Sequence, residues 1–370
     1  MTPKHFIPLM IPDIRDSDIQ RVIDVLKSGM LIQGKQVEQF ENSVAAYLGV
    51  KHVIAVSNGT ASLHMALVAL GVGPGDEVIV PAFSYVATAN AVELVGAKPV
   101  FIDVERGSFN IRVDLIEQAI TANTKVIMPV HEFGLACQIN EICEIAKRRN
   151  IFVIEDAACA LGAKINEQFV GSFGTFGSFS FHPRKAITSG EGGMLTTNDD
   201  ELAEKVRQIR NHGISMSSGK MEFVAAGFNY RLTDFQAALL IGQFERFDKT
   251  LNRRKELANH YTNKLLNQNI TKPELPIGYE HTWQSYHILL NHTLKRVDII
   301  EKLTSEGIGV NYGAQCIPAV KFYQEKYNLD CPKLFPNSWN AYYHGLVLPL
   351  YEKLTLEDLE YVIEKVNELE

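Results

Sequence analysis

Three short segments of the chain carry side chains suited to holding and activating a small ligand. The first is Ser57-Asn58-Gly59-Thr60, which follows the apolar residues 52–56. Because Gly59 lets the backbone approach a ligand, and a helix starting here would offer unpaired N–H groups, the turn suits a phosphate. An ordinary helix cap would explain the same four residues.

The second segment, Glu155-Asp156-Ala157-Ala158, follows the apolar residues 151–154. A carboxylate at the end of a strand can pair with the protonated nitrogen of a pyridine ring, and this pairing keeps such a cofactor an electron sink. A helix cap or a surface acid would also explain these carboxylates. The segment alone leaves that choice open.

The third segment places Lys185 between the aromatic stretch Ser178-Phe179-Ser180-Phe181 and the glycine-rich Gly190-Glu191-Gly192-Gly193. A buried amine, or one beside another cation such as Arg184, has a lowered pKa and can form an imine with an aldehyde. Most lysines are solvated surface charges. The neighbours of Lys185 favour the imine chemistry.

The pattern of apolar segments predicts how these three segments come together. Strands are expected at 52–56, 77–80, 98–102, 125–130 and 151–154, with helices between them at 60–70, 87–94, 113–120 and 140–149. This alternation indicates crossover connections and a mostly parallel sheet. Ligands bind at the carboxyl ends of the strands in such sheets, where all three segments would lie.

The rest of the chain has a less regular pattern. It predicts helices at 19–26, 37–48, 199–211 and 356–369, strands at 174–181 and 193–197, and a helical tract at 233–266 broken near 247–251. We therefore predict an α/β fold with a three-layer α/β/α large domain at residues 1–250. A smaller α+β domain is expected at residues 251–370.

Composition limits the class of protein. The 370 residues are 46% hydrophobic and 21% charged, as in a soluble globular enzyme. The net charge of −7, without any basic run, argues against a nucleic-acid partner. No segment has the apolar length of a membrane span or the pattern of a signal peptide. Five cysteines without a CxxC pair argue against a disulfide framework or a zinc site and favour the cytoplasm.

Three partial motifs fail on inspection. The glycines of residues 71–75 precede a strand, whereas a dinucleotide-binding turn follows one. Gly219-Lys220 is followed by Met221 in place of the Ser or Thr of a phosphate loop. His131-Glu132 begins like a zinc-protease motif, but residue 135 is leucine. Nicotinamide, nucleotide-hydrolysing and zinc-protease chemistry are therefore disfavoured.

Over nearly its whole length the sequence resembles the sugar aminotransferase family often called DegT/DnrJ/EryC1/StrS, within the fold-type-I pyridoxal-phosphate enzymes. The matching motifs are, in order, residues 57–60, 71–81, 155–158, 179–185, 190–193, 197–199, 210–213 and 227–231. The resemblance implies pyridoxal 5'-phosphate as the cofactor and a cytoplasmic homodimer with active sites shared between subunits.

The resemblance also implies roles for residues around the cofactor ring. Lys185 matches the lysine that holds the cofactor as a Schiff base, and Asp156 matches the acid that faces the pyridine nitrogen. Tyr85 lies where the family places an aromatic ring over the cofactor. Cys159 replaces a glutamine or histidine that many members have near the 3-hydroxyl group, although a small buried filler would explain it equally well.

Further roles concern the phosphate and the substrates. Gly59, Thr60 and Ser180 match residues that contact the phosphate, and Asn229 matches an asparagine that reaches it from the neighbouring subunit. Arg231 lies where a family arginine can meet the carboxylate of the amino donor.

The resemblance implies a reaction in two halves, in which glutamate gives its amino group to the cofactor and a keto substrate then receives it. Lys185 would serve as covalent anchor and as general acid and base. The loop at 188–193 resembles that of members that aminate carbon 4 of 4-keto-6-deoxyhexoses. We favour a UDP-linked 4-keto-6-deoxy-2-acetamido hexose, used for bacterial surface polysaccharides such as O-antigen.

Several alternatives remain open. A keto-cyclitol or a dTDP- or GDP-linked keto sugar would need the same cofactor site. A sugar dehydratase of this fold has histidine where this chain has Lys185, and a regulator without activity would not need Lys185 and Asp156 together. The segment from Tyr312 to Pro318 departs from the histidine-containing pattern common there, so contacts of Tyr312 with the substrate stay open.

Overall fold

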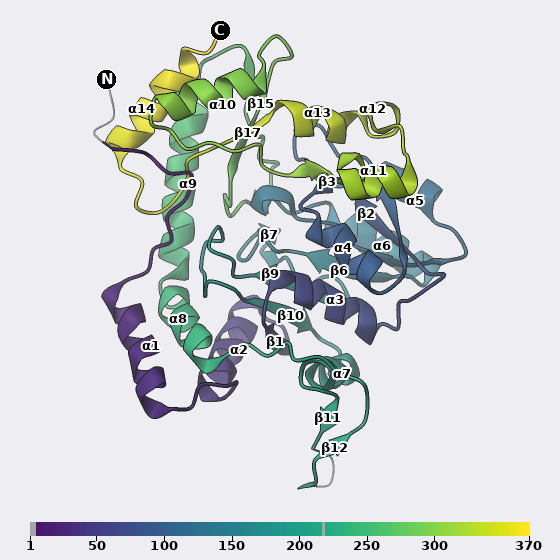
Figure 1. The fold of residues 1–370 in the computed structure, drawn as a ribbon. Coiled ribbons are helices and arrows are strands. Elements are labelled where there is room, and N and C mark those ends of the chain that lie inside the picture. The colour runs from purple at the N-terminus through teal and green to yellow at the C-terminus, as the bar shows by residue number, and fades with distance from the viewer. Residues whose placement is uncertain (1–4, 217–218) are drawn as a thin grey trace.

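The computed structural model describes residues 5–216 and 219–370, and a seven-stranded sheet forms its centre (Figure 1). The strands, in spatial order, are β1 (His52–Val56), β10 (Gly193–Thr197), β9 (Phe176–Ser180), β6 (Phe152–Asp156), β5 (Thr124–Ile127), β2 (Glu77–Pro81) and β4 (Lys98–Ile102). Neighbours pair in parallel except at β10, which is antiparallel to both β1 and β9. The prediction of a mostly parallel sheet is confirmed.

Helices cover both faces of this sheet. Side chains of a strand alternate between its two faces, so Val53 and Ala55 enter one core while Ile54 and Val56 enter the other. The first core is covered by α2 (Lys35–Leu48), α6 (Ile139–Arg149) and α8 (Asp234–Phe244). The second core is covered by α3 (Gly59–Ala69), α4 (Ala87–Leu94) and α7 (Asp200–Arg210). The α/β fold class predicted from the sequence is confirmed.

Two elements of the large part are shorter than predicted. The helix expected at 113–120 is a 3-10 turn, η1 (Val113–Leu115), followed by the four-residue α5 (Ile116–Ala119). The β-branched residues of this stretch lower helix propensity, and Ile120 is already extended. The strand expected to reach residue 130 ends at Ile127, since Pro129 has no N–H for the ladder.

The helical tract after residue 233 divides earlier than expected. Helix α8 ends at Phe244 and α9 (Phe247–Lys264) begins three residues later, whereas the sequence predicted a break near 247–251. At the junction the Arg246 guanidinium donates to both carboxylate oxygens of Asp18, on α1 (Asp16–Ser28). This contact fixes the N-terminal helix against the bend.

A separate apolar cluster forms around the C-terminal elements, drawn at the top of Figure 1. These elements are the second half of α9, β13 (Ile270–Thr271), β15 (Tyr286–Leu290), α10 (Arg296–Ser305), β17 (Gly345–Leu348) and α14 (Leu356–Asn367). Ile7 belongs to the same cluster and exchanges backbone hydrogen bonds with Gly307 and Gly309, both of 2.7 Å. The division of the chain at residue 250 stays a prediction.

The remaining elements in the described residues are short. They are β3 (Phe83–Ser84), η2 (Glu132–Gly134), β7 (Lys164–Ile165), β8 (Gln168–Phe169), β11 (Ile214–Ser215), β12 (Glu222–Phe223), β14 (Tyr279–Glu280), β16 (Gln315–Cys316), η4 (Ile317–Ala319), α11 (Lys321–Tyr327), α12 (Cys331–Leu334) and α13 (Pro336–His344). Strand β3 pairs with β16, and the hairpin of β11 and β12 projects away from the sheet (Figure 1). Two-residue strands have no readable period, so the sequence pattern missed them. No helix in the described ranges is long and apolar enough to cross a bilayer.

Candidate active site

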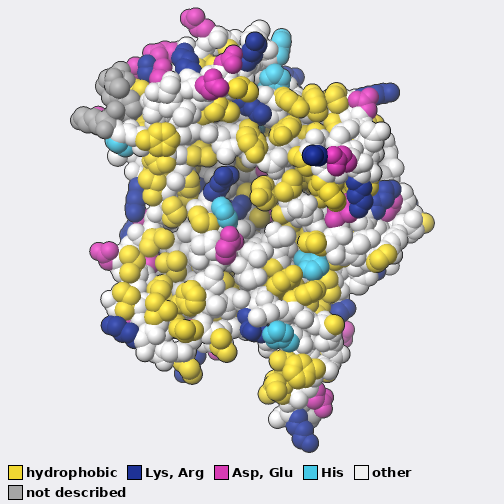
Figure 2. All heavy atoms as spheres, in the orientation of Figure 1, with side chains coloured by type: hydrophobic (Ala, Val, Ile, Leu, Met, Phe, Trp, Pro, Cys, Tyr) yellow, Lys and Arg dark blue, Asp and Glu magenta, His cyan; other side chains and the backbone are white. Residues whose placement is uncertain are grey.

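The three segments singled out in the sequence meet at one edge of the central sheet. Strand β1 leads into Ser57, β6 ends at Asp156 and β9 ends at Ser180, all at the carboxyl edge of the parallel strands. A cavity of about 760 Å³ opens at this edge. Figure 2 shows a hollow near the middle of the same face, where basic, acidic and histidine side chains gather among apolar ones.

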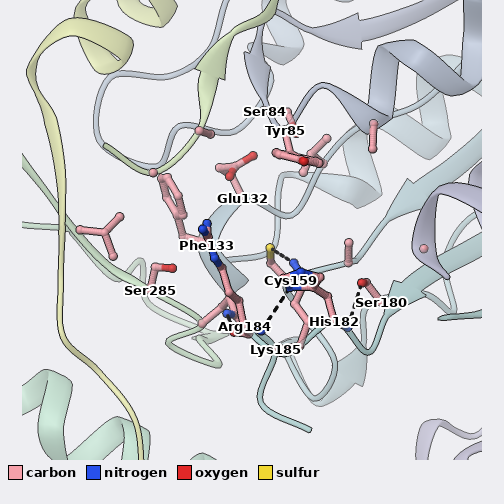
Figure 3. Close-up of a pocket in the computed structure, with 18 of the residues that line it drawn as sticks. Ser84, Tyr85, Glu132, Phe133, Cys159, Ser180, His182, Arg184, Lys185 and Ser285 are labelled. Atoms are coloured by element: carbon pink, nitrogen blue, oxygen red, sulfur yellow. Dashed lines mark hydrogen bonds between the residues drawn. The ribbon is translucent and has the colours of Figure 1, made fainter. Parts of the chain in front are cut away.

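Lys185 reaches the cavity from the loop between β9 and β10. The loop is closed by a hydrogen bond from Phe181 N to Gly192 O (2.8 Å), and the buried side chain of Ile187 anchors its middle. The half-buried Lys185 extends its amine into the cavity, where Nζ donates to Cys159 Sγ over 2.9 Å (Figure 3). The lysine is therefore positioned by both of its neighbouring strands.

Asp156 lies in the cavity wall with its carboxylate only partly satisfied. Oδ2 accepts from Thr88 Oγ1 over 2.8 Å, and Oδ1 accepts from Ala158 N over 3.2 Å. Burial raises the pKa of Asp156, whereas the Thr88 hydroxyl, the Ala158 N–H and the Lys185 ammonium lower it. A cationic ring nitrogen brought to this carboxylate would lower the pKa of Asp156 and favour its charged form.

Glu155 has a different environment, although it precedes Asp156 in the same strand. Its two oxygens accept three backbone N–H groups of residues 171–174 at 2.7–2.8 Å, and Oε2 also contacts His131 Nε2 at 3.0 Å. Successive side chains of a strand point to opposite faces. Of the two acids that the sequence left as candidates, only Asp156 lines the cavity.

The turn before α3 forms a cradle suited to a phosphate group. Asn58 caps the helix by accepting from Ala61 N over 2.8 Å. Gly59 and Thr60 lie in the first turn, where backbone N–H groups have no partner within the helix, and both residues line the cavity. A Cβ at Gly59 would lie 2.9 Å from Ser180 Cβ. Only glycine permits this close approach, so the strand end and the helix start together form one anion site.

The remaining site residues predicted from the sequence can be located in the structure. Tyr85, 65% exposed, and Tyr312 both line the cavity, as does Cys159. Burial raises the pKa of the Cys159 thiol and the Lys185 ammonium lowers it. Asn229 and Arg231 do not line the cavity of this chain: Asn229 is exposed, and Arg231 Nη1 donates to Asn211 Oδ1.

Two residues of the cavity wall were not predicted from the sequence. Thr88, which bonds Asp156, lies in the first turn of α4 and has no distinguishing sequence signal. Glu132, the second residue, belongs in the sequence only to the incomplete zinc-protease motif at 131–135. No cluster in the described ranges could hold a metal ion. An acid in the short loop after the buried strand β5, which ends at Ile127, was the signal that could have identified Glu132.

Comparison with known proteins gives the family. The model of the DegT/DnrJ/EryC1/StrS aminotransferase family matches residues 12–367. The chain belongs to this family. GDP-perosamine synthase of Caulobacter vibrioides is 45% identical over 279 residues, which cover 74% of this chain and 75% of that protein.

Two further relatives match this chain over nearly its whole length. The spore coat polysaccharide biosynthesis protein SpsC of Bacillus subtilis is 36% identical over 381 residues, covering 99% of this chain and 97% of SpsC. The putative sugar aminotransferase Spr1654 of Streptococcus pneumoniae, solved in PMP and PLP forms, superposes with a TM-score of 0.93 at 30% identity. The superposition of the PMP form covers 98% of this chain and 97% of Spr1654.

The family assignment confirms the predicted family, enzyme class and cofactor. The protein is a pyridoxal-phosphate-dependent sugar aminotransferase. The residues present fit that cofactor, because the cradle at Gly59 suits its phosphate, Asp156 suits its ring nitrogen and Lys185 offers the amine that its aldehyde requires.

Proposed function

We propose that the protein moves an amino group from glutamate to a nucleotide-linked 4-keto-6-deoxyhexose. One observation supports this most directly: a single cavity is bordered by Lys185, Asp156 and the anion cradle at Gly59 and Thr60. These are an amine, a carboxylate and a phosphate site, in the combination that transamination with pyridoxal phosphate needs.

In this proposal Lys185 has two duties. Its Nζ would be the covalent attachment point of the cofactor, and the freed amine would move a proton between the substrate carbon and the cofactor carbon in each half of the reaction. Cys159 Sγ, 2.9 Å from Nζ, accepts a hydrogen bond that keeps the free amine aimed into the cavity. The bound cofactor supplies the electron sink that stabilises negative charge on the reacting carbon.

Asp156 and the cradle orient the cofactor in the same proposal. The Asp156 carboxylate holds a proton on the ring nitrogen, and Thr88 keeps that carboxylate in place. Gly59, Thr60 and Ser180 hold the phosphate, and Tyr85 covers the ring. The 3-hydroxyl group of the cofactor would face Cys159, whose thiol makes a weaker hydrogen bond than the amide of a glutamine at this position.

The amino donor needs a cation for its carboxylate. Arg184, next to the catalytic lysine, borders the cavity. Arg231 bonds Asn211 in this chain and would have to act across a subunit boundary. Arg184 is therefore the nearer candidate within one chain, and Arg231 remains the prediction for a neighbouring site.

We propose a homodimer in which Asn229 completes the partner's phosphate site. Mixing Lys185→Ala and Asn229→Ala subunits tests this, because a mixed dimer has one site with both residues intact. After random exchange we expect activity of about a quarter of wild type, from two parents that are nearly inactive. Activity no greater than the sum of the parents would contradict sites shared in this way.

The nucleotide on the acceptor stays a prediction. The loop at 188–193 supports a 4-keto-6-deoxyhexose, and among these we favour a UDP-linked 2-acetamido sugar, whereas the Caulobacter relative is named for a GDP-linked sugar. Both fit a surface-polysaccharide role like that of the SpsC relative.

The experiment that tests the function uses the two half-reactions separately. Glutamate added to the yellow purified protein should shift its absorbance to that of the amino form. The amino form is then mixed with UDP-, GDP- and dTDP-linked 4-keto sugars and with a keto-cyclitol, and products are identified by mass. Amination of the keto-cyclitol alone, or of no acceptor, would contradict the proposed substrate class.

A further inference from the structure

Glu132 is a buried carboxyl group in the cavity wall that none of the roles above employs. Its side chain lies between Phe133 and Tyr85 (Figure 3), and the residue is only 4% exposed. The Ser84 hydroxyl bonds the carboxyl, but Oε2 has no hydrogen-bond partner among the described residues. A buried oxygen without a partner destabilises a folded protein, so such groups are rare away from functional sites.

The backbone that carries Glu132 is held in an unusual conformation. In the turn η2, Phe133 has φ 53° and Gly134 has φ 100°, both in the left-handed region. Asn110 clamps the turn: its Oδ1 accepts from Glu132 N over 2.8 Å, and its Nδ2 donates to the carbonyl oxygens of residues 135 and 136 at 3.1 Å. A strained turn of this kind persists only where its surroundings over-determine it, which is typical of functional sites.

Burial, followed by the neighbouring charges, sets the protonation state of Glu132. Burial raises the pKa of Glu132 to about 8, and the Asp156 carboxylate raises it as well, while Lys185 and Ser84 lower it. At neutral pH the group therefore holds its proton and can donate one hydrogen bond while accepting another. A hydroxyl group, which also donates and accepts, is the matching partner.

The position of Glu132 favours the acceptor over the cofactor as its ligand. Phe133, the next residue, packs against the segment around Gly313, where a Cβ would lie 3.1 Å from Phe133 Cζ. That segment lines the cavity on the side opposite the sheet. Glu132 therefore lies where the two parts of the chain meet. The Phe133 ring is packed against His287, Phe83 and Phe109, which holds this wall of the cavity in place.

We propose that Glu132 binds a hydroxyl group of the acceptor sugar next to the carbon that receives the amine. The inference rests on the proposed function and makes Glu132 a specificity-determining residue. A site that hydrogen-bonds a substrate hydroxyl rejects the analogue that lacks it, because the buried partner is then left unpaired. The chemical class of the acceptor thereby narrows to keto sugars with a free hydroxyl beside the ketone.

The test compares wild type with Glu132→Leu and Glu132→Gln. Each protein, converted to its amino form, reacts with a pair of keto sugars that differ only in the hydroxyl beside the ketone. Wild type should prefer the hydroxylated sugar by about 100-fold in kcat/KM, Glu132→Gln by less, and Glu132→Leu by under about threefold. An equal preference in wild type and Glu132→Leu would overturn the inference.

Two readouts without turnover separate this role from others. Without cofactor, Glu132→Leu should melt about 1–3 °C above wild type, since the unpaired carboxyl is removed. A lower melting temperature in both variants would overturn the inference in favour of a structural role. A shifted absorbance maximum of either variant with cofactor bound would overturn it in favour of a cofactor contact.

The outcomes also distinguish this inference from the proposed function. If wild type aminates no keto sugar, the proposed function fails and the inference fails with it. If wild type aminates the sugars but the preference for the hydroxyl survives in Glu132→Leu, only the inference fails.

Discussion

The loop after β5 and the end of the neighbouring strand β6 each carry two adjacent residues, and the two residues of each pair face different surroundings. His131 and Glu155 point into the scaffold, where they contact each other and their remaining polar atoms accept backbone N–H groups. Glu132 and Asp156 are the next residues in each case, and they face the cavity with incomplete hydrogen bonding. The polar side-chain atoms of His131 and Glu155 all have partners, whereas Glu132 Oε2 has none among the described residues and each Asp156 oxygen has only one.

This difference indicates which buried polar groups stabilise the fold and which are available to a ligand. Buried polar groups stabilise a fold only when all their partners are present, and an incomplete set stays available for a ligand. Changes on the scaffold side should therefore reduce stability. Changes on the cavity side should reduce activity and leave stability nearly unchanged.

Lys185→Ala should have the largest effect on the cavity side. We expect turnover to fall by more than about 10⁴-fold, because anchor and proton carrier are lost together. The unfolding free energy should change by less than about 1 kcal/mol, because Lys185 is only half-buried. Turnover and urea denaturation measure the two quantities, and full activity would remove Lys185 from the mechanism.

The adjacent acids allow a matched comparison. Asp156→Asn should lower kcat by about 10²–10³-fold at nearly unchanged stability, since the charge opposite the cofactor is lost. Glu155→Gln should lower the unfolding free energy by about 2–4 kcal/mol, because an amide N–H₂ would face backbone donors in the saturated scaffold. The reverse pattern in denaturation and rate measurements would contradict the division.

The pH dependence of stability should carry a signature of Glu132. In the cofactor-free native state its pKa is about 8, against 4.5 for an ordinary glutamate, so the native state holds a proton that the unfolded chain has released. The protein should therefore lose stability as pH rises from about 4.5 to about 8, by at most about 1.4 kcal/mol per pH unit.

The best window for measuring this effect lies above pH 6.5. Burial lowers the pKa of His281 and His287 to about 3, which makes stability rise with pH up to 6.5, the ordinary value for histidine. Between pH 6.5 and 8 we expect wild type to lose stability and Glu132→Gln to lose less. Parallel slopes of the two proteins in urea denaturation would show that Glu132 is ionised in the native state.

The smallest expected effect comes from a cap on the scaffold. Asp199 caps α7 by accepting from Leu202 N over 2.9 Å, so Asp199→Ala should cost about 1 kcal/mol of stability. Thr355→Ala, at the equivalent cap of α14, is the matched control in the C-terminal part and should cost a similar amount. Neither substitution should change kcat. A loss of activity at full stability would contradict the proposal that scaffold residues affect stability and cavity residues affect activity.

The large elements and the main cofactor residues could be predicted from the amino-acid sequence. Alternating apolar strands and helices predicted the parallel sheet, and the carboxyl ends of β1, β6 and β9 brought Gly59, Asp156 and Lys185 together. The long elements were predictable because the periods 2 and 3.6 are properties of local sequence. The family motifs supplied the individual roles that remain predictions.

Which side chain of each adjacent pair faces the cavity could be seen only in the folded chain. That choice depends on strand register and on distant partners, such as Asn110 for the turn at Glu132 and the N–H groups of residues 171–174 for Glu155. The tertiary structure also placed Arg231 away from the cavity of its own chain and showed that Glu132 is buried without a full set of partners. Contacts between residues far apart in sequence leave no local pattern, so they had to be seen in the folded chain.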